Sequence, residues 1–175
     1  GSMTAQHIFL VGPMGAGKST IGKYLADLLD LPFVDVDTEI ESRAGADIQW
    51  IFDMEGEQGF RDRECKVLVD LAGKEQPTVI ATGGGIVLRD ENREVLQRSG
   101  KVIYLSATAE QLFERTRRDK SRPLLQVDDR RTVIAQLVET RDPLYNQVAD
   151  LVFPSGSVQP NKLAKKLAEA LSALC

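Results

Sequence analysis

Short apolar runs alternate with longer segments of helical periodicity along the chain. The apolar runs predict buried strands at residues 7–11, 33–36, 78–81, 102–105 and 151–153. Apolar residues at spacings of three and four predict helices at 19–29, 46–55, 57–72, 109–118, 130–141 and 161–174, with Gly56 separating the second from the third. Because strands separated by helices need crossover connections, this pattern predicts an α/β fold whose mostly parallel sheet is covered by helices on both faces.

Residues 119–129 (DKSRPLLQVDD) form the one stretch without a clear period. They lie between two predicted helices and contain Pro123, and the sequence around them is locally basic. A charged stretch of this kind is either an ordinary surface loop or a mobile lid. In a lid, an arginine such as Arg122 could close over a phosphoryl group during its transfer.

The composition is that of a folded, acidic protein. The 175 residues are 42% hydrophobic and 27% charged, with a net charge of -4. A chain of this length can bury a core without disulfides or a structural metal, and Cys65 and Cys175 form no disulfide framework, which suits a reducing cytoplasm. The net charge disfavours a general nucleic-acid binder, and no apolar run approaches the length of a membrane span.

The sequence reads as one domain. Gly1 and Ser2 ahead of Met3 look like an expression scar before the initiator methionine. Residues 4–175 contain no internal repeat and no low-complexity linker, and their number is typical of a single domain.

The sequence GPMGAGKS at residues 12–19 matches the phosphate-binding pattern GxxxxGK[ST] between the first predicted strand and the helix after it. Its glycines let backbone N–H groups turn toward phosphate oxygens, and the helix N-terminus adds partial positive charge. Lys18 can reach the β- and γ-phosphates, and the Ser19 hydroxyl can bind Mg²⁺. The motif therefore predicts a nucleoside triphosphate site and leaves the acceptor open. We assign to this site Gly12, Gly15, Ala16, Gly17, Lys18, Ser19 and Thr20.

Two carboxylates follow the second predicted strand, at Asp35 and Asp37. At the period of two, they share one face of that strand. Since parallel sheets bind ligands beyond the carboxyl ends of their strands, one carboxylate can hold metal-bound water and the other can accept a proton from an attacking hydroxyl. The alternative for Asp37 is a purely structural N-cap of a helix beginning near Thr38.

The third predicted strand leads into Thr82, Gly83, Gly84 and Gly85. Many phosphate-binding loop enzymes place a metal-binding Asp at such a strand end, whereas this chain offers a threonine and bare backbone. Glycines allow a ligand to approach backbone N–H groups closely. The run therefore predicts a binding loop, with an ordinary tight turn as the alternative.

Two arginines lie on the apolar side of predicted helices. Arg61 is in register with Cys65 and Leu68, and Arg141 follows Leu137 and Val138 on an apolar stripe. A guanidinium that points inward needs an anion, because an unpaired buried charge is very costly. Together they suggest an acidic acceptor. For Arg61 an internal ion pair with Glu64, three residues on, remains an equal alternative.

These motifs together resemble the shikimate kinase family in its bacterial form. The resemblance covers roughly residues 7–153, and the chain after residue 154 matches loosely. It implies a nucleoside-monophosphate-kinase-like fold with five parallel strands, a moving lid at about 119–129 and substrate-binding helices at about 37–73. The matching segments are GPMGAGKST (12–20), DVD (35–37), GEQGFRDRE (56–64), GGG (83–85), RPLL (122–125) and RDPLY (141–145).

The resemblance implies transfer of the γ-phosphoryl group of ATP to the 3-hydroxyl of shikimate. Asp37 would hold the shikimate hydroxyls, acting as a base or only orienting the reacting hydroxyl. Arg61 and Arg141 would bind the carboxylate, with backbone contacts from residues 83–85. Catalysis would rest on Lys18, Asp37 and Arg122.

The same resemblance assigns the nucleotide side and the metal. Arg122 would reach the phosphates from the lid, Arg115 would stack on the adenine, and Pro160 would face the other side of that ring. Mg²⁺ would be bound by Ser19 directly and by Asp35 through water. We expect a cytoplasmic monomer that binds ATP and shikimate and neither nucleic acid nor membranes.

Other functions compatible with a phosphate-binding loop remain as alternatives. One is another small-molecule kinase on this fold, acting on gluconate or a nucleoside monophosphate. A nucleotide-dependent switch is disfavoured, because its guanine motif NKxD is absent: the one Asn-Lys pair, at 161–162, is followed by Leu163 and Ala164. A catalytically dead binding module is disfavoured by the intact Lys18, Ser19 and Asp37.

Overall fold

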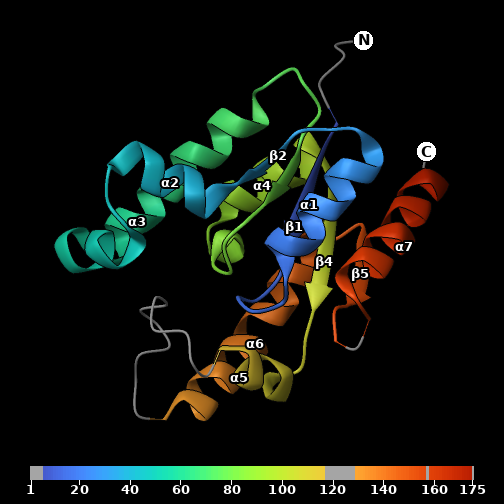
Figure 1. The fold of residues 1–175 in the computed structure, drawn as a ribbon. Coiled ribbons are helices and arrows are strands. Elements are labelled where there is room, and N and C mark those ends of the chain that lie inside the picture. The colour runs from blue at the N-terminus through green and yellow to red at the C-terminus, as the bar shows by residue number, and fades with distance from the viewer. Residues whose placement is uncertain (1–5, 117–128, 157, 175) are drawn as a thin grey trace.

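The computed structural model describes residues 6–116, 129–156 and 158–174. In this part of the chain, five strands form one parallel sheet in the order β2-β3-β1-β4-β5 (Figure 1). The predicted parallel α/β sheet is confirmed. The strands are β1 (His7–Val11), β2 (Phe33–Asp35), β3 (Val79–Ala81), β4 (Gly100–Ser106) and β5 (Leu151–Pro154).

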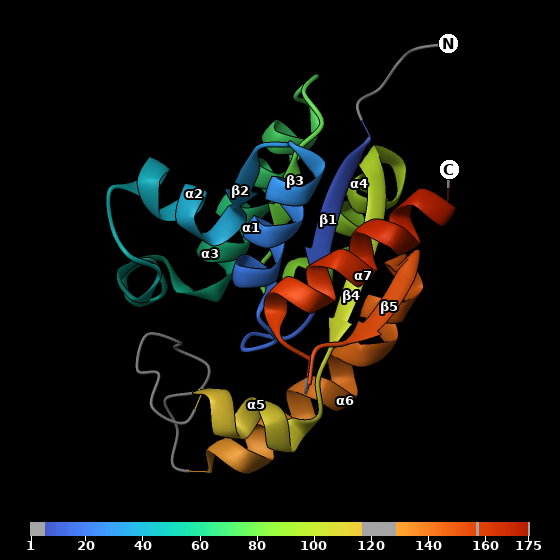
Figure 2. The ribbon, with the colours of Figure 1, turned by 45° about the vertical axis from the view of Figure 1, so that its right-hand side comes forward.

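Helices cover both faces of the sheet (Figure 2). Side chains from α1 and α7 pack on one face, and side chains from α2, α3, α4 and α6 pack on the other. Strand β1 shows why its sequence is apolar throughout: Ile8 and Leu10 face α1 and α7, while Phe9 and Val11 face the opposite layer. The helices are α1 (Lys18–Leu29), α2 (Val36–Ala44), α3 (Ile48–Ala72), α4 (Asp90–Ser99), α5 (Ala109–Thr116), α6 (Arg130–Val148) and α7 (Pro160–Ala173), with a 3-10 turn at Ile86–Leu88.

The structure corrects the prediction at three helices. Strand β2 stops at Asp35, and α2 begins at Val36, because the Asp35 side chain caps the helix. Helix α4 was not predicted, since its sequence DENREVLQRS is largely polar and buries few apolar side chains. Helix α6 runs on to Val148 although Pro143 lies inside it; the packing of buried Tyr145 in the core favours the helix beyond the proline.

Helix α3 contains a break at Gly56, as the sequence predicts. Gly56 has φ 74° and ψ 178°, a backbone conformation outside the helical region that side-chain-bearing residues rarely adopt. The break separates a first half with exposed Trp50 and Met54 from a second half whose inner side is buried. It therefore allows Arg61 and Glu64 to face the core while the start of α3 lies at the edge of the molecule.

The carboxyl ends of the central strands meet at one edge of the sheet. The phosphate-binding loop follows β1, helix α2 follows β2, and the glycine loop (residues 83–85) follows β3. These motifs, which span residues 12–85 of the sequence, are thereby neighbours. In the described part of the chain, every helix is too short or too polar to cross a membrane.

Candidate active site

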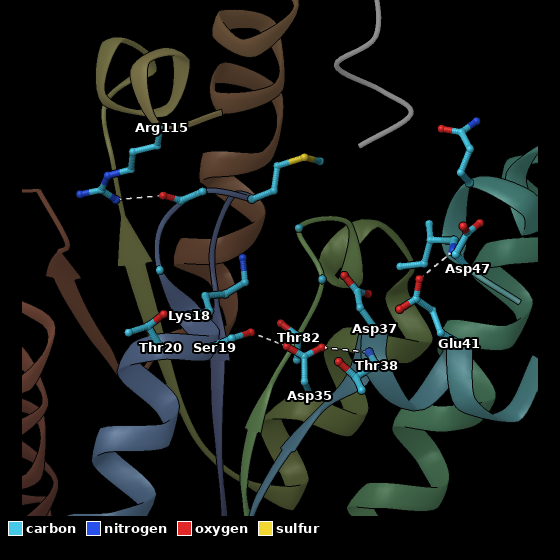
Figure 3. A pocket seen from close by; sticks show the side chains of 17 residues that line it. Lys18, Ser19, Thr20, Asp35, Asp37, Thr38, Glu41, Asp47, Thr82 and Arg115 are labelled. Atoms are coloured by element: carbon cyan, nitrogen blue, oxygen red, sulfur yellow. Dashed lines mark hydrogen bonds between the residues drawn. The ribbon is translucent and has the colours of Figure 1, made fainter. Parts of the chain in front are cut away.

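A cavity of about 840 Å³ opens at this edge of the sheet. One wall is formed by the phosphate-binding loop and the start of α1, and the other by α2, the start of α3 and the glycine loop. Figure 3 shows Lys18 from α1 and Asp37 from α2 both directed toward the opening. The cavity therefore joins the predicted triphosphate site to the predicted acceptor side.

The phosphate-binding loop requires glycine for two different reasons. Gly12, Gly15 and Gly17 have φ of 146°, 89° and 87°, in the region that residues with a side chain rarely adopt. Space is also short, because a methyl group on Gly12 would lie 2.4 Å from the Leu105 carbonyl oxygen. The loop backbone is thus held close to β4, with Ala16 buried in the core beneath it.

Lys18 is hydrogen-bonded to the phosphate-binding loop. Its Nζ donates to the carbonyl oxygens of Gly12 at 2.6 Å and Pro13 at 2.9 Å. The side chain is 8% exposed, so its positive charge lies at the floor of the cavity beside the loop N–H groups. An anion that binds in the loop would contact the Lys18 ammonium, which is already buried and oriented toward the loop.

Ser19 and Asp35 place a hydroxyl oxygen and a carboxylate side by side next to Lys18. The Ser19 hydroxyl donates to Asp35 Oδ2, and Asp35 Oδ1 accepts the backbone N–H of Thr38 at 3.1 Å. The helix-capping role therefore belongs to Asp35, and the alternative that Asp37 is the N-cap is wrong. Thr82 lies on the same wall, its hydroxyl donating to the Leu10 carbonyl at 2.8 Å.

Asp37 reaches the cavity from the first turn of α2 rather than from a strand. The expectation that it shares a strand face with Asp35 is wrong, because β2 ends at Asp35. Both carboxylates nevertheless line the cavity. Asp37 lies against the glycine loop: a methyl group on Gly83 would be 2.8 Å from Asp37 Oδ1.

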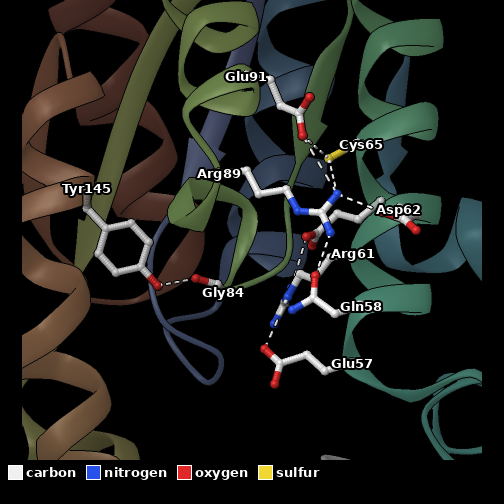
Figure 4. A network of polar contacts seen from close by, with 10 residues as sticks. Glu57, Gln58, Arg61, Asp62, Cys65, Gly84, Arg89, Glu91 and Tyr145 are labelled. Carbon is white, nitrogen blue, oxygen red and sulfur yellow. Dashed lines mark hydrogen bonds and ion pairs between the residues drawn. The ribbon is translucent and has the colours of Figure 1, made fainter.

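Arg61 is buried in an ion-pair cluster next to the glycine loop (Figure 4). Its Nη1 is 2.9 Å from Glu64 Oε1, and its Nε is 3.6 Å from Glu57 Oε2. The ring of Phe60 lies 5.1 Å from the guanidinium carbon. The internal ion pair that the sequence left open is therefore present, and Arg61 also faces the loop.

The glycine loop is bare because charged side chains occupy the space that a Cβ would need. A methyl group on Gly85 would lie 2.4 Å from Arg61 Nη1. One on Gly83 would lie 3.1 Å from Glu64 Oε2, in addition to its contact with Asp37. None of the three glycines has a positive φ. The requirement at this loop is therefore steric, which the sequence alone does not reveal.

Arg141 reaches the same loop from α6. It is 6% exposed and makes no ion pair with any residue that the structure describes. A methyl group on Gly84 would be 3.4 Å from its Nη1. Because a buried guanidinium without a carboxylate partner is costly, this position is suited to an anion that arrives from outside the protein.

Within the described structure, the residues that line this cavity include Gly83 and Gly84. They do not include Gly85, Arg61 or Arg141. Arg141 lies against Gly84, which lines the cavity, and Arg61 lies against Gly85, the next residue of the loop. The structure thus brings Asp37 and both arginines together around three consecutive glycines.

Glu64 belongs to this cluster and was not among the predicted site residues. It is fully buried, and its Oε2 has no hydrogen-bond partner among the described residues. Burial raises the pKa of Glu64, against the opposing influence of Arg61. Its spacing of three from an inward arginine on the same helix indicated it only as a possible ion-pair partner of Arg61, and that pair is present.

We expect Glu64→Gln to change how stability depends on pH. Because the pKa of Glu64 is raised in the folded protein, its proton is held more tightly there than in the unfolded chain, whose ordinary value is 4.5. The stability that this group contributes is present below that value and is lost as pH rises through the folded pKa. Glutamine keeps the size and does not ionise, so the variant should gain stability relative to the wild type as pH rises.

Thermal unfolding of both proteins between pH 5 and 8, without ligands, measures this difference. A difference in Tm that is independent of pH, or one that moves in favour of the wild type as pH rises, contradicts the raised pKa.

Arg115 binds backbone oxygens at the nucleotide end of the cavity. It donates to the carbonyl oxygens of Gly15 at 2.9 Å, Ser155 at 2.9 Å and Gly156 at 3.0 Å. These bonds link the phosphate-binding loop to the segment between β5 and α7. Pro160, the other residue predicted at the adenine, is the first residue of α7 and is not one of the described residues that line the cavity.

The predicted lid at 119–129, with Arg122, lies outside the described residues except for its last position. Asp129 caps helix α6, its side chain accepting the backbone N–H of Thr132.

Comparison with known proteins gives a consistent result. Residues 14–172 match the family model described as shikimate kinase. The shikimate kinase of Histophilus somni is 51% identical over 170 residues, covering 97% of each chain. That of Francisella tularensis subsp. novicida is 50% identical over 166 residues, covering 95% of this chain and 94% of the relative.

A solved structure agrees with these relatives. The shikimate kinase of Acinetobacter baumannii in complex with shikimate superposes with a TM-score of 0.94 and 45% identity, covering 98% of this chain and 95% of the other. Family model, sequence and structure agree over almost the whole length, and the chain belongs to the shikimate kinase family.

Proposed function

We propose that this enzyme transfers the γ-phosphoryl group of ATP to the 3-hydroxyl of shikimate, giving shikimate 3-phosphate and ADP, a step of chorismate and aromatic amino-acid biosynthesis. The observation that carries the proposal is the cavity itself, in which a phosphate-binding loop faces a glycine loop backed by two buried arginines. Shikimate combines a carboxylate with hydroxyls and so matches arginines beside an acidic side chain. The Acinetobacter baumannii relative was solved with shikimate bound.

On the acceptor side, we assign the shikimate carboxylate to Arg61 and Arg141 and its hydroxyls to Asp37 and the backbone of the glycine loop, Gly83 to Gly85. Arg141 offers a desolvated charge without a carboxylate partner among the described residues, and Arg61 keeps Glu64 as its partner. This arrangement would fix the six-membered carbon ring of shikimate so that one hydroxyl faces the γ-phosphate. Positioning of this kind supplies much of the rate in phosphoryl transfer.

In the chemical step, the 3-hydroxyl oxygen forms a bond to the γ-phosphorus while the bond from that phosphorus to the β–γ bridging oxygen breaks, and ADP leaves. The hydroxyl proton passes to Asp37, or, where Asp37 only orients the hydroxyl, it is released late to a phosphoryl oxygen of the product or to solvent. The charge that develops on the phosphoryl oxygens would be stabilised by Lys18 and by the loop N–H groups. Arg122 would add a further positive charge from the lid.

On the nucleotide side, the loop glycines Gly12, Gly15 and Gly17 with Ala16 and Thr20 would surround the phosphates. Lys18 would exchange its bonds to two loop carbonyls for bonds to the β- and γ-phosphates. Arg115 would stack on the adenine, with Pro160 on the other side of the ring. The hydrogen bonds that Arg115 donates to the loop after β5 support this position for the adenine, because they hold that loop next to the phosphate site.

The residues that would hold Mg²⁺ fit a hydrated magnesium ion. Ser19 offers a hydroxyl and Asp35 a carboxylate, and the two are already in contact beside Lys18. Hard oxygen donors with one carboxylate are what Mg²⁺ takes when it arrives with a phosphate substrate. When bound, the ion supplies neutralisation of the phosphate charge; Ser19 would ligate it and Asp35 would orient its water.

An ADP-release assay tests the proposal. With ATP and Mg²⁺, we expect ADP formation to depend on shikimate and to be absent with gluconate and with nucleoside monophosphates. Omitting Mg²⁺ should abolish the rate. A turnover that prefers gluconate or a nucleoside monophosphate would replace shikimate as the acceptor and favour the alternative kinase.

We also propose that residues 4–175 act as one kinase domain and as a cytoplasmic monomer. In the part of the chain that the structure describes, the strands belong to one parallel sheet that carries the cavity at its edge, which supports the first part. Light scattering of the purified protein tests the monomer, and a dimer mass would contradict it.

A further inference from the structure

Tyr145 connects helix α6 to the glycine loop. Its hydroxyl donates to the Gly84 carbonyl oxygen at 2.5 Å, and the side chain is 1% exposed (Figure 4). Its ring packs on Tyr104 of β4 with centroids 4.8 Å apart, which fixes the direction of the hydroxyl. Burial raises the pKa of Tyr145 to about 12, so the hydroxyl keeps its proton and remains a donor at neutral pH.

The same hydroxyl lies beside the arginine assigned to the acceptor. Arg141 precedes Tyr145 by one helical turn, so the two side chains lie on the same face of α6. A methyl group on Gly84 would be 3.4 Å from Arg141 Nη1 and 3.7 Å from the Tyr145 oxygen. Gly84 therefore contacts both side chains, and the nearby guanidinium acts against the rise in the pKa of Tyr145.

Holding the Gly84 carbonyl has a defined effect on the loop. A trans peptide is planar, and its C=O and N–H groups point in opposite directions. A carbonyl fixed toward α6 therefore turns the N–H of Gly85 away from α6. Glycine has wide backbone freedom, so a run of three glycines needs an outside contact to keep one peptide orientation.

We propose that Tyr145 is a positioning residue for the acceptor substrate, holding the glycine loop and Arg141 in the arrangement that receives it. The inference rests on the proposed function, because it takes shikimate as the acceptor. Tyr145 would not touch the reacting atoms. Its loss should weaken acceptor binding far more than nucleotide binding, since its bond is to the loop after β3, and Gly84 only packs against the Met14 backbone of the phosphate-binding loop.

The chain provides a matched control in Tyr104. Tyr104 is buried in the same stacked pair, and its hydroxyl donates to Asp142 Oδ1 at 2.6 Å instead of to the glycine loop. Tyr104→Phe therefore removes a tyrosine hydroxyl from the same cluster without removing a bond to Gly84. A general effect of losing a polar contact here should appear in both variants, and a positioning effect only in Tyr145→Phe.

The experiment measures kcat and both KM values for the wild type, Tyr145→Phe and Tyr104→Phe, with Tm as a check of folding. We expect Tyr145→Phe to raise the KM for shikimate about tenfold, the size expected for one buried hydrogen bond. The KM for ATP should stay within about twofold, because the Tyr145 hydroxyl bonds to the glycine loop, which only packs against the Met14 backbone of the phosphate-binding loop. Tyr104→Phe should leave both KM values unchanged. Shikimate binding without turnover can be followed by the fluorescence of Trp50, the chain's single tryptophan, which is adjacent to Gln49 of the cavity wall.

A second variant separates positioning from packing. If Tyr145 acts by holding Arg141, then Tyr145→Phe should have a smaller effect on the KM for shikimate when it is made in Arg141→Lys than in the wild type. Additive effects overturn the part of the proposal that concerns Arg141. An unchanged KM for shikimate in Tyr145→Phe, an equal rise of both KM values, or the same rise in Tyr104→Phe overturns the positioning role. A wild type that does not phosphorylate shikimate overturns the proposed function, and this inference with it.

Discussion

Asp37→Asn is expected to lower kcat by roughly 10²–10⁴-fold, which corresponds to about 3–5 kcal/mol of barrier. The carboxylate lines the cavity between the phosphate-binding loop and the glycine loop, where an acceptor hydroxyl would face the γ-phosphate. Asparagine keeps the size and can still form hydrogen bonds, but it takes no proton and carries no charge. Steady-state turnover at saturating ATP and shikimate measures the effect.

Asp47→Asn is a matched control for this prediction. Asp47 also lines the cavity, but its side chain caps α3 by accepting the backbone N–H of Trp50 at 2.8 Å. Asparagine caps helices about as well as aspartate, so this variant should fold and keep near-normal turnover. Near-normal turnover in Asp37→Asn would remove Asp37 from the chemistry. An equal loss in both variants would point to the charge of the cavity rather than to a particular carboxylate.

Arg141→Ala is expected to raise the KM for shikimate by roughly 10²–10³-fold, because contacts of a desolvated guanidinium with an anion are worth about 2–5 kcal/mol when one partner is removed. Arg141 is buried and faces Gly84, and within the described structure no carboxylate pairs with it. The KM for ATP should change little, since the phosphate-binding loop makes its own contacts. Initial rates with each substrate varied in turn provide both values.

Arg131→Ala, on the same helix, is the control. Arg131 pairs with Glu110 on the surface, where its side chain is 55% exposed, and such pairs contribute little. Both KM values should match the wild type. If Arg141→Ala instead loses ATP binding and keeps shikimate binding, the assignment of Arg141 to the acceptor is wrong.

The prediction from sequence succeeded where local pattern is enough. Strand β1 is apolar at every position after His7, and it proved to be buried on both faces. The glycine at position 56 indicated the break in α3, because its conformation is a local property of the backbone. The phosphate-binding loop carries its own chemistry in consecutive residues and could be located without knowledge of the rest of the fold.

The prediction failed where neighbours in space outweigh local pattern. The run Val34, Asp35, Val36 and Asp37 alternates like a strand, yet the Asp35 side chain caps a helix that starts at the next residue. The helix predicted at 130–141 continues to Val148 through Pro143, and the buried Tyr145 packs on Tyr104 beyond the proline. In both segments a contact visible only in the structure selected the conformation.

The sequence by itself determined the fold class, the triphosphate site and, through its motifs, the family. These follow from the spacing of hydrophobic residues, the chemistry of the loop residues and the order of the motifs, all of which can be read from the sequence alone. The tertiary structure decided which side chains meet around the glycine loop. Tyr145 lies on Gly84 across 61 residues of sequence. Arg61 fills the space beside Gly85 that a Cβ would need, and Glu64 lies against Gly83 next to Asp37. Such neighbours are set by the packing of α3 and α6 against the strand ends, and packing between distant segments leaves no periodic trace in a single sequence.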